Sequence, residues 1–392
     1  MPMKILDMLR GGWRTEQRAA DPSWNALTGG GSNSAVGQHV DAKSAESIST
    51  VFGCVQALSE STACLPLHTY RRNDDGSRER VDGHWLSRLL DRPNDWQTGM
   101  EFREEATACV LLRGNSYSRK DIDGKGEVVS LVPLHPDRMT VVKLPSGKLR
   151  FDYSEERGNA TKLLAEEVMH LRDRSEPGNP VARSRIAIAR DTLGLSLALR
   201  AHGSGVFGRG ARPAGIITNE GTRDLTTPEL TAFQQRLENY ASPANAGKTL
   251  LLLKGMKYQN AGLSNEDAEW LAAMQFGVTE VCRIFRVPPI LVQTLEQASY
   301  NNVNEFGQQF VRFSLQRWLT MWEEGISRSL LGPIARQRFY AEHSVDALMR
   351  GNGEARAEFY AKALNNEPWM DVDEVRRLEN LPQRHVANDA TR

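Results

Sequence analysis

The apolar residues in the first third of the chain follow two different periods. Over residues 44–64 they recur every three or four positions, which predicts a helix, and Pro66 then forces an extended exit into a predicted strand at 67–72. Thr98 and Glu101 have the spacing of a capping box and open a second predicted helix. The pattern therefore predicts helices interleaved with extended segments.

Strand-like patterns take over after the second of these helices. Residues 115–134 predict two strands joined by an Asp-Gly turn, and residues 139–153 predict a second hairpin that turns at Ser146 and Gly147. Helices that pack on antiparallel strands define the α+β class, which we predict for residues 41 to about 173.

The second half of the chain is predominantly helical. A small α/β module at 212–263 separates the first two of the predicted helices, which span residues 183–202, 265–286, 303–331, 353–364 and 372–378. The second of these carries a narrow apolar seam suited to packing on another helix, formed by Leu271, Met274, Val278, Val281 and Phe285.

One segment of the small module is close to a phosphate-binding loop. The motif G-x-x-x-x-G-K-[ST] is matched except at its first glycine, which is Ser242, with Gly247, Lys248 and Thr249 in register. Phosphate binding requires a strand before the loop and a helix after it, so that loop amides and a helix N-terminus face the phosphates. Here a predicted helix precedes the loop and a strand-like run follows it, which favours a simple turn. A nucleotide hydrolase that uses Lys248 and Thr249 stays open as an alternative.

A second glycine motif has a similar weakness. Gly203, Gly205 and Gly208 spell G-x-G-x-x-G, but a dinucleotide site needs a strand before this motif, and the predicted 183–202 helix stands there instead. We interpret these glycines as residues that end the helix and redirect the chain.

Composition excludes several classes of protein. Forty-nine basic residues balance 49 acidic ones among 392, so the chain lacks the positive excess typical of tight nucleic-acid binders. The four cysteines have no C-x-x-C spacing, which argues against a zinc site or a disulfide framework. No apolar run approaches the length of a membrane span, and residues 1–40 lack apolar periodicity and are expected to be flexible.

The sequence shows no catalytic apparatus. Metalloprotease motifs, nucleophile elbows and dense clusters of Asp, Glu and His are all absent. His135 and His170 stand at predicted strand ends, where a hydrogen-bonded structural role is more common than a role as ligand or base. We therefore predict no enzyme activity and no cofactor.

Several segments, in chain order, resemble the portal proteins of long-tailed double-stranded DNA phages. Together they cover about residues 41–382, and they read SISTVFGCVQALSESTACLPLHTYRR, LLRGNSYSRKDIDGKGEVVSLVPLHPDRMTV, RPAGIIT, NAGKTLLLLKGMKY, IFRVPPILV, YNNVNEFGQQFVRFSLQRW and DEVRRLENLP. The resemblance implies a ring of normally twelve subunits at one capsid vertex, with a central channel for double-stranded DNA and no ATPase activity of its own.

The resemblance also implies an order of parts along the chain. These are a flexible segment at 1–40, an α/β wing at 41–182, a first stem helix at 183–211, a small α/β clip at 212–263, a second stem helix at 264–287, a tunnel loop at 288–302, a long helix and return to the wing at 303–350, and a small helical crown with the C-terminal tail at 351–392.

Roles for particular residues follow from this resemblance. The tunnel loop would line the channel through Glu296, Gln297, Ser299, Tyr300, Asn301 and Asn302. The clip would face the large terminase subunit and later the head-tail connector proteins through Asn245, Gly247 and Lys248. The apolar seam of the 264–287 helix would serve stem and oligomer packing.

The expected setting is the virion. The ring would sit within the shell of the major capsid protein after assembly in the host cytoplasm, without a membrane, a metal or a cofactor. A head-assembly adaptor without a channel stays open as another alternative.

Overall fold

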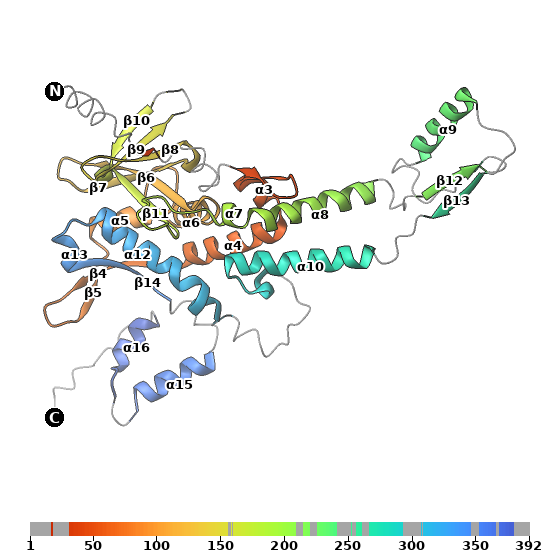
Figure 1. Cartoon of the computed structure of the whole chain (residues 1–392). Coiled ribbons are helices and arrows are strands. Elements are labelled where there is room, and N and C mark those ends of the chain that lie inside the picture. Colours follow the sequence, from red (N-terminus) through yellow and green to blue (C-terminus); the bar gives the residue numbers. More distant parts are fainter. Residues whose placement is uncertain are drawn as a thin grey trace, which may run out of the picture.

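The computed structural model describes residues 17–18, 31–155, 158, 160–208, 215–219, 226–240, 252, 256–260, 266–292, 307, 309–345, 353–365 and 368–379. A body rich in strands lies at one end of the molecule, and a pair of helices projects from it toward a small distal module (Figure 1). The α+β class predicted for the first part of the chain is confirmed.

Three antiparallel sheets build the body. The first orders β11 (Val168–Arg172), β6 (Asn115–Ile122) and β7 (Val128–Leu134). The second orders β1 (Gln17–Arg18), β8 (Met139–Lys143), β9 (Leu149–Ser154) and β10 (Ala160–Leu164). The third orders β14 (Phe339–His343), β4 (Leu67–Arg72) and β5 (Arg78–Arg80). Both predicted hairpins are confirmed, whereas no local pattern indicated β14.

Helices pack among these sheets and carry the main core. They are α3 (Ala42–Glu46), α4 (Ser49–Cys64), α5 (Trp85–Asp91), α6 (Gly99–Arg113), the π-helix η6 (Phe310–Leu315), α12 (Gln316–Leu330) and α13 (Ala335–Arg338). Trp322 of α12 is buried against Phe102 of α6, and its Nε1 donates a hydrogen bond to Thr107 Oγ1 at 2.9 Å. Short 3₁₀ turns η1 (Pro136–Arg138), η2 (Ala165–Glu167) and η4 (Pro289–Val292) complete the connections.

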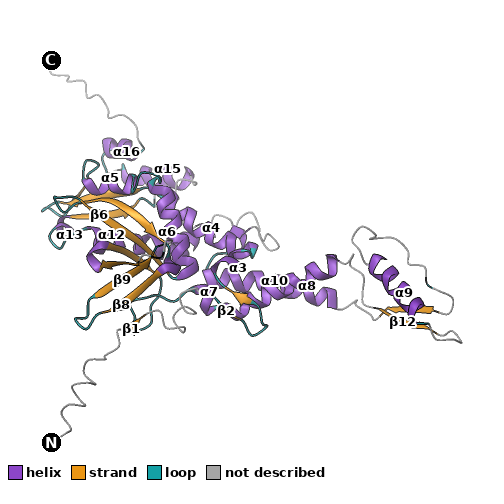
Figure 2. Cartoon of the chain, turned by 90° about the horizontal axis from the view of Figure 1, so that it is seen from above, coloured by secondary structure: helices purple, strands orange, loops and turns teal. Residues whose placement is uncertain are grey.

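The projecting pair consists of α8 (Arg190–Gly208), which follows the short α7 (Arg185–Ile188), and α10 (Glu266–Phe285). The two helices run side by side away from the body in both views (Figures 1 and 2). Beyond them lie the paired strands β12 (Gly215–Asn219) and β13 (Met256–Asn260) with α9 (Thr227–Tyr240). Two further helices, α15 (Gly353–Ala363) and α16 (Val372–Leu378), lie near the C-terminus.

The capping box predicted at Thr98 is present. Its hydroxyl accepts from the Glu101 amide, and the Glu101 carboxylate accepts from the Thr98 amide at 2.8 Å. Because this pair satisfies backbone donors that a helix start leaves free, α6 begins where the sequence predicts.

Described structure begins earlier than the predicted start near residue 41, with β1 at residues 17–18 and a continuous described stretch from residue 31. Strands β2 (Ser32–Asn33) and β3 (His39–Val40) form a small hairpin beside α8. Arg190 donates to Ser32 Oγ at 2.9 Å, and Asp191 Oδ1 accepts from the Ala35 amide at 2.9 Å. These contacts come from residues more than 150 positions away, so local periodicity could not reveal them.

Candidate functional site

Two predicted groups of site residues lie outside the described residues. They are the tunnel-loop residues Glu296, Gln297, Ser299, Tyr300, Asn301 and Asn302, and the clip residues Asn245, Gly247 and Lys248. The α9 helix precedes the segment with the clip residues, as predicted. Most of the strand predicted after that segment also lies outside the described residues.

The predicted apolar seam of α10 divides into two parts. Val281 and Phe285 are buried in the main core, and Val278 packs against its edge. Met274 is 36% exposed, while the side chain of Leu271 lies outside the description. The end of α10 near the body is thus fixed by burial in the main core, whereas Met274, farther out, lies at the surface.

The helix pair is held together by a close contact at a glycine. Trp270 of α10 donates from Nε1 to the Leu199 carbonyl of α8 at 3.2 Å. Its ring covers Gly203 so closely that a Cβ there would lie 2.5 Å from a ring carbon. Gly203 stands inside α8, which continues to Gly208, so the interpretation that it ends the helix is wrong. Its small size serves helix packing.

Large apolar side chains remain exposed on the helix pair. Leu195 of α8 is 47% exposed, and Phe276 of α10 is 62% exposed. Ile188 of α7, where the pair leaves the body, is also exposed. Exposed apolar side chains along a narrow two-helix projection mark a surface suited to contact with another protein.

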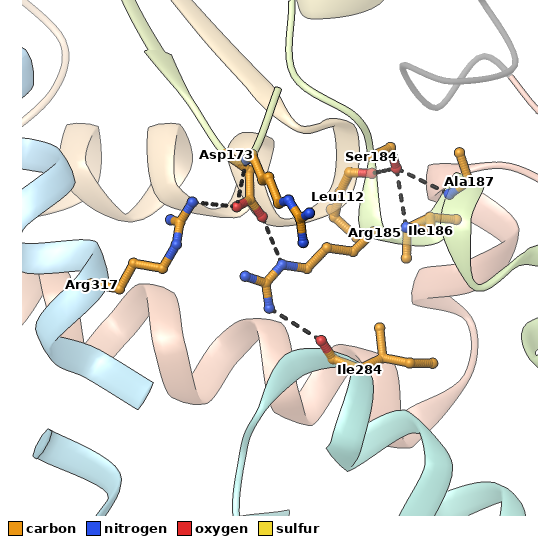
Figure 3. Close-up of polar contacts among 9 residues, drawn as sticks. Leu112, Asp173, Ser184, Arg185, Ile186, Ala187, Ile284 and Arg317 are labelled. Atoms are coloured by element: carbon orange, nitrogen blue, oxygen red, sulfur yellow. Dashed lines mark hydrogen bonds and ion pairs between the residues drawn. The ribbon is translucent and has the colours of Figure 1, made fainter. Parts of the chain in front are cut away.

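A buried carboxylate joins this helix pair to the body. Asp173 directly follows β11, and only 5% of its side chain is exposed. Its Oδ2 accepts from Arg185 Nε of α7 at 2.7 Å, and its Oδ1 accepts from Arg317 Nη2 of α12 at 2.6 Å (Figure 3). Arg185 also donates to the Ile284 carbonyl near the end of α10 at 3.2 Å. One carboxylate therefore connects elements that belong to four separate segments.

The start of α7 is tied to the same region. The Ser184 hydroxyl accepts from the Ile186 and Ala187 amides and donates to the Leu112 carbonyl of α6 at 2.6 Å (Figure 3). The same serine therefore caps α7 and forms a hydrogen bond to α6, and these contacts limit the directions that the chain can take into α8.

The described segments before and after the predicted tunnel loop are joined to each other. Arg286 adopts a left-handed backbone conformation with φ of 59° directly after α10, and the Val287 amide donates to the Cys282 carbonyl at 3.0 Å. On the return side, the Ser314 hydroxyl of η6 donates to the Arg286 carbonyl. A non-glycine residue rarely adopts this conformation, so the surrounding contacts hold the exit from α10 in place.

The predicted structural role of the two histidines is consistent with their surroundings. His135 accepts from the Asp137 amide at 3.3 Å, and His170 is hydrogen-bonded to Asn115 Oδ1 at 3.0 Å. Burial, with the positive charges of Arg172 and Arg328, lowers the pKa of His170 to about 3. Within the described part of the chain, no group of three or more His, Cys, Asp or Glu side chains is placed to hold a metal ion. No helix found there has the length and apolar character to cross a bilayer.

The family model for the phage portal protein matches residues 49–380, most of the chain. The chain belongs to the phage portal protein family. It is 32% identical over 339 residues to the portal protein of Enterobacteria phage HK97, a match that covers 86% of this chain and 79% of that protein.

Solved structures with a similar fold come from gene transfer agent particles. The chain is similar to a structure described as the neck of an empty gene transfer agent particle computed with C6 symmetry, at 25% identity, with a TM-score of 0.62 over 85% of this chain and 90% of that one. It is also similar to the neck of the native particle computed with C12 symmetry, at 23% identity, with a TM-score of 0.59 over 86% and 91% of the two chains.

Family membership excludes one of the two alternatives left open by the sequence, the nucleotide hydrolase. The chain is a structural component of the virion at its portal vertex and is not an enzyme. The nucleotide-hydrolase reading of Lys248 and Thr249 is therefore wrong.

We expect Asp173→Asn to lower the free energy of unfolding by about 3 kcal/mol, because it leaves the half-buried Arg185 without its counter-charge. Asp82→Asn is a matched control, since Asp82 pairs with Arg80 at an exposed position and its loss should cost less than about 1 kcal/mol. Urea unfolding followed by circular dichroism measures both. Equal effects of the two substitutions would contradict the central role of Asp173.

A pH dependence is expected from His170. Its pKa is about 6.5 in the unfolded chain and about 3 in the folded one, so below pH 6.5 only the unfolded state gains the proton. The free energy of unfolding should therefore fall by about 1.4 kcal/mol per pH unit from this residue between pH 6 and pH 4. The comparison protein is His170→Gln, whose side-chain amide can still donate a hydrogen bond to Asn115 but has no group that titrates in this pH range. Parallel stability curves for the two proteins would show that His170 does not contribute.

Proposed function

We propose that this chain assembles into a closed ring, normally of twelve subunits, whose channel passes double-stranded DNA during packaging and ejection. The observation that carries the proposal is the projecting helix pair with exposed Leu195, Met274 and Phe276, a surface that a single narrow stem leaves uncovered. Similarity to two neck structures described with six-fold and twelve-fold symmetry supports a ring. Contacts in such a ring are heterologous, since each subunit uses one face against a different face of the next.

We assign the observed elements to the expected parts in chain order. The three sheets with α4, α6 and α12 correspond to the wing at 41–182 and 303–350, where β14 makes the return by pairing with β4. The helix pair corresponds to the stem at 183–211 and 264–287, and the distal strands with α9 to the clip at 212–263. Helices α15 and α16 correspond to the crown within 351–392.

The clip lies farthest from the body along the stem, which suits it to contact other proteins (Figure 1). We assign to it the docking of the large terminase subunit during packaging and of head-tail connector proteins afterwards. The wing would contact the major capsid protein. The balance of 49 basic and 49 acidic residues suits a conduit, because dense phosphate binding would hold DNA and resist its movement.

The tunnel loop at 288–302 would form the narrowest part of the channel. Arg286 precedes it, and the hydrogen bond from Ser314 to the Arg286 carbonyl joins the described segments on its two sides. Such anchoring allows a polar loop to project toward DNA while the framework stays rigid.

We expect the purified chain to form an oligomer near twelve times 43.8 kDa in light scattering coupled to size exclusion, with rings in negative-stain images. Phe276→Asp should raise the protein concentration needed for assembly at least tenfold, because the new charge would be buried without a partner. Val129→Asp changes another exposed apolar residue, on β7, and should assemble as wild type. A monomeric wild-type protein would refute the ring and favour the adaptor alternative.

Deletion of residues 297–301 should leave ring assembly intact and reduce the yield of particles that retain packaged DNA. The reason is that the loop would touch the cargo, whereas the described anchors and the stem hold the framework. Counting infectious particles and measuring DNA protected from nuclease test this expectation. Full infectivity with stably filled capsids would show that the loop is dispensable for DNA handling.

A further inference from the structure

An open cavity of about 540 Å³ lies between β11 and α12, next to the junction at Asp173. Leu171 and Met321 give it an apolar floor. Four guanidinium groups line it, those of Arg172, Arg317, Arg328 and Arg336. We call this cavity the arginine pocket.

The positive charge of the arginine pocket is incompletely balanced within the chain. Arg317 pairs with Asp173, which is shared with Arg185. The other three arginines make their hydrogen bonds in the described structure to carbonyl oxygens, which are Pro180 O for Arg172 at 2.7 Å, His170 O for Arg328 at 2.7 Å, and Leu331 O for Arg336 at 2.9 Å. Across the described ranges, no carboxylate lies within 4.0 Å of these three.

The charged form of Arg328 is disfavoured in the arginine pocket. Burial, and then the charge of Arg172, lowers the pKa of Arg328 below its ordinary value. Glu324 also lines the pocket, but four guanidinium groups still face two carboxylates, one of which is already engaged. Like charges held together in a concave site are stabilised when an anionic partner enters.

A surface of opposite charge lies elsewhere on the same chain, at residues 95–105. It comprises the end of the segment that follows α5 and the first turns of α6. We call it the acidic loop. Trp96 is 64% exposed and Met100 42% exposed. Carboxylates flank them, at Asp95, Glu101, Glu104 and Glu105.

The acidic loop is held rigidly by buried contacts at its base. Asn94 is buried, its Oδ1 accepts from the Trp96 and Gln97 amides, and its Nδ2 donates to the Leu131 carbonyl at 3.0 Å. Gly99 packs directly on the Leu90 carbonyl, so no larger residue fits there. A preorganised loop loses little conformational entropy on binding, and an exposed tryptophan is a frequent anchor of protein interfaces.

We propose that the acidic loop of one subunit docks into the arginine pocket of the next. This inference rests on the proposed ring. In the described part of a single chain, no ion pair joins the acidic loop to the arginine pocket, and the opposite charges of these two surfaces make a second copy a partner that fits both. Glutamates of the acidic loop would form ion pairs with guanidinium groups of the arginine pocket. The Trp96 ring would lie against Met321 and stack on one of these guanidinium groups. Two different patches meet, as a heterologous ring requires.

Charge reversal tests this contact. The pocket variant Arg172→Glu/Arg328→Glu and the loop variant Glu104→Arg/Glu105→Arg should each raise the concentration for half-assembly at least tenfold. Combining all four substitutions should restore assembly to within about threefold of wild type. Arg88→Glu, on the exposed side of α5, is the matched control and should assemble normally. Glu101 is left unchanged because it caps α6.

Folding and alternative partners are separated by further measurements. Unfolding midpoints show whether the charge-reversed pocket variant folds. If it does not fold, the milder pair Arg172→Gln/Arg328→Gln is used instead, and this pair should raise the concentration for half-assembly at least threefold. A ring that forms in wild type and is unaffected by either reversal would refute this contact and leave the ring proposal standing.

The alternative partner is DNA. Pocket variants with normal assembly but reduced affinity for a 20-base-pair DNA duplex would assign the arginine pocket to phosphodiester binding and overturn the inference. A monomeric wild type would refute the ring itself, and the contact with it.

Discussion

The arrangement of this chain depends on one buried carboxylate. Asp173 leaves β11 with almost no exposure to water and must find its charge partners inside the protein, and it finds them on α7 and α12. Removing such a group from water costs several kcal/mol, and well-placed cations and hydrogen bonds must offset that cost. Since Arg185 also reaches the end of α10, the direction of both projecting helices relative to the body is set at this point.

This junction gives the stem a rigid base while its outer part stays available for contacts between subunits. Near the body, Val281 and Phe285 are buried in the main core. Farther out, Trp270 and Gly203 hold the two helices together, and Phe276 faces outward. A ring component needs this division, because a subunit must keep its own shape while it offers apolar surface to its neighbours.

Several elements could be predicted from local signals. The capping box at Thr98 and the turns of the two hairpins act within a few residues, so their outcome follows from short-range hydrogen bonding and steric preference. The apolar seam of α10 was also visible as a spacing. What the spacing could not show is which half of the seam is buried within the chain, because that depends on packing against α4, about 200 positions earlier in the chain.

By itself the sequence determined the α+β class, most helix and strand positions, the absence of known catalytic motifs and, through its resemblance to a family, the portal assignment. Only the tertiary structure decided that residues 31–40 form a hairpin on α8, that β14 pairs with β4, that Gly203 accommodates Trp270, and that four arginines gather beside Asp173. These features share a physical reason. Each requires two segments far apart in the chain to meet, and the free energy of that meeting comes from burial and charge pairing that exist only once the whole fold has formed.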